Sequence, residues 1–164
     1  MTRLTEKLSK YFPSSSGPAT GTYALVLLLA RSRMIKIGKL GSFIFPSGHY
    51  AYIGSAFGSG GLYARIKRHM RKEKRFHWHI DYLRQHAVIE EIWICREKTK
   101  SEHAWARFLE NHIGTELPIH GFGCSDCTCT THLFHFDSRP SFHKFATSTR
   151  NVFPASASLL RIQL

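Results

Sequence analysis

The sequence has few acidic residues and no long apolar segment. Asp and Glu number 11 against 23 Lys and Arg, so the formal net charge is +12. A field of this sign attracts polyanions and favours nucleic acid as a partner. The longest apolar run, YALVLLLA, is too short to span a bilayer, and the N-terminus lacks the apolar core of a signal peptide. We therefore expect a soluble, cytoplasmic protein with no membrane partner.

Cysteine is also scarce. Cys95 lies alone in a predicted strand, whereas Cys124, Cys127 and Cys129 share one loop with His132. In a reducing compartment such a cluster indicates metal or thiol chemistry before disulfides. The four loop residues are candidate zinc ligands, but zinc loops usually separate two ligand pairs, and burial of the loop against a sheet explains the pattern equally well. No helix N-terminus or basic neighbour is evident to activate a catalytic thiol.

Ser, Pro and Gly concentrate near both ends of the sequence, a composition typical of linkers. Residues 1–20 are expected to form a flexible N-terminal segment, and residues 138–164 a C-terminal tail. The folded domain then spans residues 21–137. The hydrophobic content of 43% is sufficient for one packed core.

Hydrophobic periodicity between these ends predicts alternating strands and helices. The segment from Thr22 to Ala30 is apolar on both faces, which is typical of a central strand covered on both sides. The spacing of Leu62, Ile66 and Met70 predicts an amphipathic helix. The expected strands are 22–30, part of MIKI, 49–53 and 88–95, and the expected helices are 62–72, 78–85 and one starting at Ser101. This order predicts a small α/β domain with a partly antiparallel sheet.

Two tripeptides suggest a site at one edge of that sheet. GTY opens the first strand and YIG closes the strand over 49–53. Antiparallel pairing would bring Tyr23 close to Tyr52, with Gly54 allowing a sharp turn into the next helix. Arg65 and His69 are four residues apart, so they share one face of that helix and are expected to point toward the two phenols.

A carboxylate further along the chain, that of Glu102, is the last candidate residue of this site. Glu102 lies three residues before Trp105 and seven before Leu109, which aligns it with the inward face of the third predicted helix. Glu110 falls on the other side, beside Arg107, where an exposed ion pair is the ordinary expectation. Glu102 is therefore the predicted functional carboxylate.

These residue types suit hydrolysis of a phosphodiester. A carboxylate can hold a divalent cation against a phosphate oxygen, an arginine can stabilise the charge of the transition state, and a phenol can act as a general base. Because an isolated tyrosine has a pKa near 10, the base role requires nearby positive charge. Arg65, His69 and the metal are expected to supply it.

The motifs resemble the GIY-YIG nuclease superfamily and, more narrowly, its DUF123 family. Similar segments are YAYIGSA, RIKRHMRKEKRFHWHIDYL, SEHAWA and GFGCSDCTCTTHLF, within about residues 21–136. The resemblance implies an α/β fold with a small, mainly antiparallel central sheet flanked by helices. Thr22 stands where the superfamily usually has Ile, and the insert between the motifs, which carries KIGKLGSFIFPSG, is longer than usual.

The resemblance also implies an endonuclease that hydrolyses DNA phosphodiester bonds with one Mg²⁺ or Mn²⁺ ion, in DNA repair or processing. Matched by position, Tyr23 is the candidate general base, and Tyr52 orients or assists the water. Arg65 stabilises the transition state, His69 orients Arg65 or contacts phosphate, and Glu102 holds the metal. The main alternative is a non-catalytic nucleic-acid-binding module with the same fold, and a third is an interaction domain stabilised by zinc.

Basic residues run through and beyond the helix that carries Arg65. In a chain this basic they suit contact with a nucleic-acid backbone, DNA being favoured over RNA, although such a run is also typical of a solvated surface. The candidate nucleic-acid contacts are Lys67, Arg68, Arg71, Lys72, Lys74 and Arg75.

The segment RFHWHIDYL follows this run. His77 and Asp81 are four residues apart, so in a helix they can form a hydrogen-bonded pair. A structural pair of these side chains is expected, with Trp78 and Tyr82 packing inward.

Overall fold

A computed structural model of the chain describes residues 3–13, 17–112, 119–152 and 158–164. Its helices are α1 (Arg3–Tyr11), α2 (Gly61–Met70), α3 (His79–Arg84), α4 (Glu102–His112) and α5 (Phe142–Thr149). Its strands are β1 (Gly21–Leu29), β2 (Arg33–Ile37), β3 (Gly41–Phe45), β4 (Gly48–Ala56), β5 (Val88–Arg96), β6 (Leu133–Phe136) and β7 (Leu159–Gln163). The mixed α/β class predicted from the sequence is confirmed.

Five of the strands form one central sheet in the order β6-β4-β1-β5-β7. Each neighbouring pair in it is antiparallel, so the sheet is more uniformly antiparallel than the partly antiparallel sheet expected. The first strand has the predicted central position. Leu25 and Leu27 are buried on one face of β1, and Ala24 and Val26 are buried on the other.

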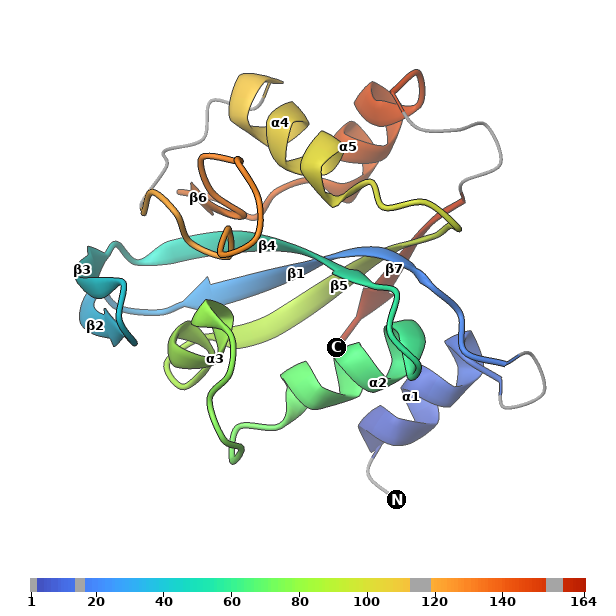
Figure 1. Cartoon of the computed structure of the whole chain (residues 1–164), viewed down its shortest axis with the longest axis horizontal. Helices are drawn as coiled ribbons and strands as arrows, with labels where there is room; N and C mark the ends of the chain where they lie inside the picture. Colours follow the sequence, from blue (N-terminus) through green and yellow to red (C-terminus); the bar gives the residue numbers. More distant parts are fainter. Residues whose placement is uncertain (1–2, 14–16, 113–118, 153–157) are drawn as a thin grey trace.

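Helices cover both faces of this sheet (Figure 1). Leu8 of α1, Leu62 of α2 and Leu83 of α3 belong to the core on one face. Trp105 of α4 and Phe145 of α5 belong to the core on the other face. No helix in the described residues is long and apolar enough to cross a membrane.

Both ends of the chain take part in the fold, so the predictions of a flexible N-terminal segment at 1–20 and a tail at 138–164 are wrong. Leu8 is 1% exposed, and the Arg96 side chain donates a hydrogen bond to the Tyr11 carbonyl. At the other end, β7 pairs with β5 through Ile92 and Ile162. A few apolar residues within a polar composition are enough to anchor each end, because the sheet already presents surface to bury.

The long insert between the two tyrosine motifs forms a separate hairpin. Strands β2 and β3 pair only with each other, and β3, which contains SFIF, was not among the expected strands. The β1–β4 ladder runs without a break from Gly21 opposite Ala56 to Leu29 opposite Gly48, and the hairpin projects from its end (Figure 1). The insert therefore leaves the pairing of the two motif strands intact.

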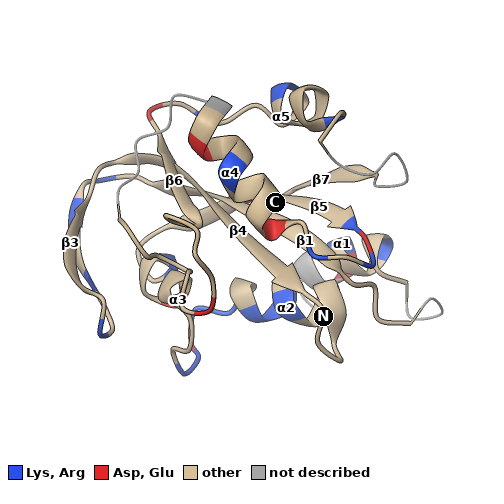
Figure 2. Ribbon diagram, turned by 45° about the horizontal axis from the view of Figure 1, so that its top comes forward, with Lys and Arg blue, Asp and Glu red and all other residues tan. Residues whose placement is uncertain are grey.

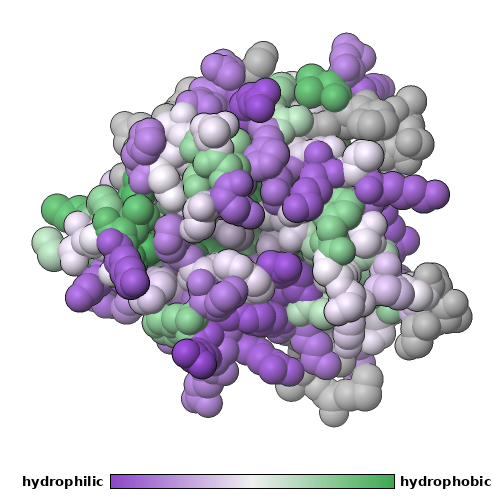
Figure 3. All heavy atoms as spheres, in the orientation of Figure 1, coloured by the Kyte–Doolittle hydropathy of each residue, from purple (hydrophilic) through white to green (hydrophobic). Residues whose placement is uncertain are grey.

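The hairpin also carries exposed apolar side chains. Met34 is 73% exposed and Ile44 is 65% exposed. Figure 3 shows apolar residues gathered at this end of the molecule. Ile35, Ile37 and Phe45 are instead buried, so the alternation along the hairpin packs one face of it against the domain.

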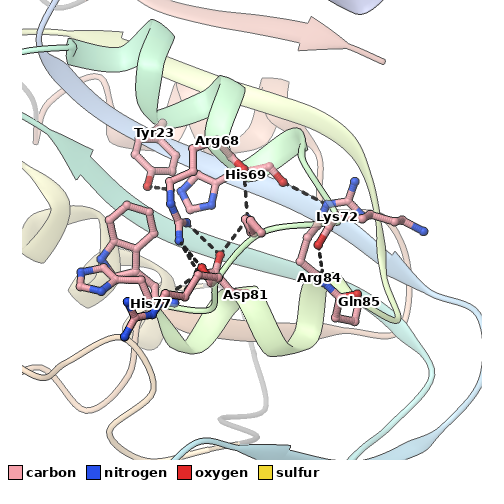
Figure 4. Close-up of polar contacts among 11 residues, drawn as sticks. Tyr23, Arg68, His69, Lys72, His77, Asp81, Arg84 and Gln85 are labelled. Atoms are coloured by element: carbon pink, nitrogen blue, oxygen red, sulfur yellow. Dashed lines mark hydrogen bonds and ion pairs between the residues drawn. The ribbon is translucent and has the colours of Figure 1, made fainter.

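A buried carboxylate joins α2 to α3. Asp81 has no exposed side-chain surface; it accepts two hydrogen bonds from Arg68 and lies 2.8 Å from the Lys74 Nζ (Figure 4). Backbone N–H groups of His77 and Trp78 also donate to it. The predicted His77–Asp81 pair therefore exists through the main chain of His77, while the His77 imidazole is exposed.

This arrangement keeps Asp81 ionised. Burial alone would raise the pKa of its carboxyl, but hydrogen bonds from Arg68 and Lys74 and from the two backbone N–H groups hold the pKa well below its ordinary value. Since Lys74 has a side chain only 7% exposed, removing the charge of Asp81 would leave a nearly buried ammonium without its partner.

We expect Asp81→Asn to lower the free energy of unfolding by about 3–5 kcal/mol, the usual cost of breaking a buried ion pair from one side. Chemical denaturation of the purified variant measures this loss. Glu73→Gln is the matched control, because Glu73 is an exposed carboxylate in the segment between α2 and α3. Equal midpoints for the two variants would contradict the structural role of Asp81.

Candidate active site

A cleft of about 500 Å³ opens where the two tyrosine motifs meet. Its walls come from β1, β4, α2, the segment before α3, the start of α4 and the loop over 119–132. Among its lining residues are Tyr23, Tyr52, Arg65, Trp78, Glu102 and His132. Four of the five predicted catalytic residues thus line one cleft, and the fifth, His69, lies directly behind Tyr23.

The strand register sets the two tyrosines side by side. Tyr23 lies opposite Gly54, and Leu25 lies opposite Tyr52, so the two phenols are diagonal neighbours on the same face of the sheet. Gly54 is inside β4 and makes no turn, which corrects the expected reason for this glycine. A Cβ there would lie 2.5 Å from the Tyr23 Cζ and closer still to its hydroxyl. Glycine is needed because the phenol rests on the backbone.

His69 closes the back of the cleft. Its Nε2 lies 2.8 Å from the Tyr23 hydroxyl (Figure 4). Its ring packs against the rings of Tyr52 and Trp78. The side chain is 1% exposed, and its Nδ1 has no hydrogen-bond partner among the described residues.

The environment of His69 keeps its imidazole neutral. Burial, together with the positive charges of Lys74, Arg65 and Arg68, lowers the pKa of His69 to about 3, although Asp81 acts in the opposite direction. The expectation that His69 adds positive charge beside the tyrosines is therefore wrong. Its role is that of a neutral hydrogen-bond partner of Tyr23.

The two phenols are protonated in the free protein. Burial raises the pKa of Tyr23 well above its ordinary value, and Tyr52 and Glu102 raise it further, whereas Arg65 lowers it in part. Burial likewise raises the pKa of Tyr52. A phenolate at either position thus needs more positive charge than the surrounding side chains provide.

Arg65 lines the cleft together with the two tyrosines, and its charge remains available to a ligand. Its guanidinium lies 4.2 Å from the centre of the Trp78 ring, a cation–π geometry that holds it over the cleft. No carboxylate in the described part of the chain pairs with it. The Arg68 guanidinium lies at a similar distance, 4.1 Å, from the centre of the same ring, but it forms an ion pair with Asp81.

Glu102 stands in the first turn of α4 with its side chain 15% exposed, as the helix spacing predicted. Glu102 lines the cleft, and so does Asp126 of the 119–132 loop. Carboxylate oxygens with room for water are what a Mg²⁺ or Mn²⁺ ion requires, so these residues fit the cation that the sequence implied.

The basic run divides into two groups. Lys67, Arg71, Lys72 and Arg75 are exposed, in keeping with the predicted contact surface, and Figure 2 shows basic residues along α2 and beyond it. The structure gives Arg68 and Lys74 a different role, because both bind the buried Asp81.

Sequence reasoning missed two residues at the mouth of the cleft. Lys100 and His77 are exposed and line it. Lys100 lies two residues before Glu102, and its place at the start of a helix carrying a candidate metal ligand was a signal that could have found it. Both side chains can meet an anionic ligand that enters the cleft.

The cysteine loop lies beside this cleft with a ligand set that differs from the expected one. Cys127, Cys129 and His132 come together as predicted, but the fourth member is His103 of α4. Cys124, the predicted fourth ligand, directs its Sγ toward the Phe122 carbonyl at 3.4 Å. His103 was missed because it is distant in sequence and only folding brings it to the loop.

Comparison with known proteins gives a family. Residues 22–153 match the family model described as "Domain of unknown function DUF123", and the chain therefore belongs to this family. Searches of curated proteins and of solved structures found no significant match.

We expect Gly54→Ala to displace the Tyr23 phenol and to lower the free energy of unfolding by about 1–3 kcal/mol, because the added methyl overpacks the sheet. Thermal or chemical denaturation measures the loss. Gly58→Ala is the matched control, since an added Cβ at Gly58 meets nothing within 4 Å. If both variants unfolded together with the wild type, the close approach of Tyr23 to Gly54 would be refuted.

The neutral His69 should make stability depend on pH. Unfolded chains protonate this histidine below a pKa near 6.5, whereas the folded chain resists until about pH 3. Stability contributed by His69 is therefore lost as pH falls through this window, by at most about 1.4 kcal/mol per pH unit.

Denaturation curves between pH 7 and about pH 4 test this for the wild type and His69→Gln. The variant should show the shallower slope. His143→Gln, which changes an exposed histidine of α5, should keep the wild-type slope. Parallel slopes for the wild type and His69→Gln would show that His69 titrates normally in the folded protein.

Proposed function

We propose that this protein is a metal-dependent endonuclease of the GIY-YIG type that hydrolyses phosphodiester bonds in DNA. The observation that carries the proposal is the cleft, where Tyr23, Tyr52, Arg65 and Glu102 meet from four separate elements. The net charge of +12 supports an anionic polymer as the substrate.

The topology supports membership of the GIY-YIG superfamily. The strand with GTY and the strand with YIG are direct antiparallel neighbours, and the helix with Arg65 follows the second strand. The insert that separates the motifs is accommodated in the β2–β3 hairpin, so the departure in motif spacing does not weigh against the assignment.

Arg65 would bind a phosphate oxygen and stabilise the charge that develops on it. The guanidinium is held over Trp78 and has no competing carboxylate in the described residues, so it needs little rearrangement to do so. Lys100 and His77 would contact neighbouring phosphates at the mouth of the cleft. Glu102 would hold Mg²⁺ or Mn²⁺, which supplies further neutralisation of the scissile phosphate and lowers the pKa of water.

Tyr23 and His69 would move the proton together. Since the pKa of Tyr23 is raised, the phenol is protonated before the reaction and cannot act as a preformed phenolate base. It can instead take a proton from the attacking water while passing its own to the His69 Nε2, 2.8 Å away. A phosphate beside Arg65 offsets one of the positive charges that lower the pKa of His69, so substrate binding favours this transfer.

The second candidate is a DNA-binding module without cleavage. The burial of Tyr23 and Tyr52, at 1% and 7% exposed, favours it, because packed phenols can be purely structural. Both functions predict salt-sensitive binding through the exposed residues Lys67, Arg71, Lys72 and Arg75. Only the nuclease requires Glu102 and a divalent ion.

The deciding experiment incubates supercoiled and branched DNA with the protein and Mg²⁺ or Mn²⁺. We expect cleavage that stops with chelator and that falls by a factor on the order of 10²–10³ in Arg65→Ala, the usual loss for one transition-state donor. Glu102→Gln should not cleave DNA, and adding Mg²⁺ or Mn²⁺ should not stimulate it. DNA affinity, measured by fluorescence anisotropy, should change little in Glu102→Gln.

Glu110→Gln and Tyr63→Phe are the matched controls. Glu110 lies on the same helix as Glu102, and Tyr63 lies on α2, and neither lines the cleft. Both controls should cleave like the wild type. If the wild type binds DNA but leaves every substrate intact, the binding module is the better assignment; equal cleavage by wild type and Glu102→Gln would indicate a contaminating nuclease.

A further inference from the structure

Four side chains form a compact cluster beside the cleft: His103, Cys127, Cys129 and His132. Each offers one ligand atom, and these atoms all lie within 4.8 Å of one another. The His103 Nδ1 is 3.2 Å from the Cys129 Sγ, and the His132 Nε2 is 3.5 Å from the Cys127 Sγ. Ligand atoms around tetrahedral zinc are separated by about 3.3–3.8 Å, given the usual Zn–N and Zn–S bond lengths.

We propose that this protein holds a structural zinc ion on His103, Cys127, Cys129 and His132. Two thiolates and two imidazoles are a regular zinc ligand set, and four protein ligands leave no open position for catalysis. Thiolate sulfur also distinguishes this ion from the Mg²⁺ or Mn²⁺ of the cleft, which prefer oxygen. The zinc site stands independently of the proposed nuclease activity.

The chain supports the ligands from outside the cluster. The second ring nitrogen of His103, Nε2, faces the Glu102 carboxylate at 3.7 Å. The His132 backbone is fixed by hydrogen bonds with Ile53 and Phe122, which anchor it beside β4.

The site would hold an irregular loop in place. Residues 119–132 contain no helix or strand, yet Gly123, Asp126 and His132 from this segment line the cleft. Zinc would tie the loop to the first turn of α4, next to Glu102. The ion would thus fix one wall of the cleft without entering it.

Metal analysis of untagged, full-length protein tests the site directly. We expect roughly one zinc ion per chain after purification. The double variant Cys127→Ser/Cys129→Ser and the variant His103→Ala should lose it. Cys124→Ser is the matched control, since Cys124 is a cysteine of the same loop outside the cluster, and it should keep the zinc.

Cobalt provides a second measurement on the wild-type chain, independent of whether the variants fold. Co²⁺ added to chelator-treated protein should give the intense visible absorption of a tetrahedral site with sulfur ligands, and Zn²⁺ should abolish it. Zinc should also raise the melting temperature of the wild type and of Cys124→Ser, with no rise in the double variant.

Three results would overturn the proposal. One is wild-type protein that contains no zinc and gives no cobalt spectrum. Another is loss of two thiols under denaturing, non-reducing conditions, which would show that the loop holds a disulfide. The third is zinc kept by His103→Ala but lost in Cys124→Ser, which would restore a ligand set confined to the loop. None of these readouts depends on DNA cleavage.

Discussion

The contact of the Tyr23 phenol with the backbone of Gly54 is the constraint on which the rest of the site depends. It requires β1 and β4 to be antiparallel neighbours in one register, because a shift of one residue would turn Tyr23 to the other face. The same hydroxyl reaches His69, which places α2 over that face of the sheet. With α2 in place, Arg65 lies over the cleft.

One buried carboxylate, that of Asp81, binds some of the basic side chains and leaves the others free to face solvent. Both carboxylate oxygens of Asp81 accept hydrogen bonds from Arg68, and the carboxylate also pairs with Lys74 and accepts from two backbone N–H groups. Its hydrogen-bonding capacity is then largely filled, which leaves Arg65 without an acidic partner among the described residues. A single acidic residue thus determines which cations of the basic run hold the fold together and which face solvent.

The sequence alone predicted those features whose residue pattern lies within a single helix or strand. Strand β1, helix α2 and the place of Glu102 follow from periodicity and spacing within one element. Helix α5 and strand β7 could not be found in this way, since each presents only one or two apolar residues to a surface made elsewhere. The roles of Arg68 and Lys74 were hidden for another reason: a run of basic residues has the same composition whether it binds a buried carboxylate or faces water. His103 likewise joins the cysteine loop only through tertiary structure.

Trp78 has a consequence for how this molecule can be observed. Of the three tryptophans, Trp93 and Trp105 are buried in the core, and Trp78 alone is partly exposed, in the cleft and against the Arg65 guanidinium. Its indole emission is therefore the part of the intrinsic fluorescence that a soluble quencher can reach. The native chain carries its own optical reporter of cleft occupancy, with no label required.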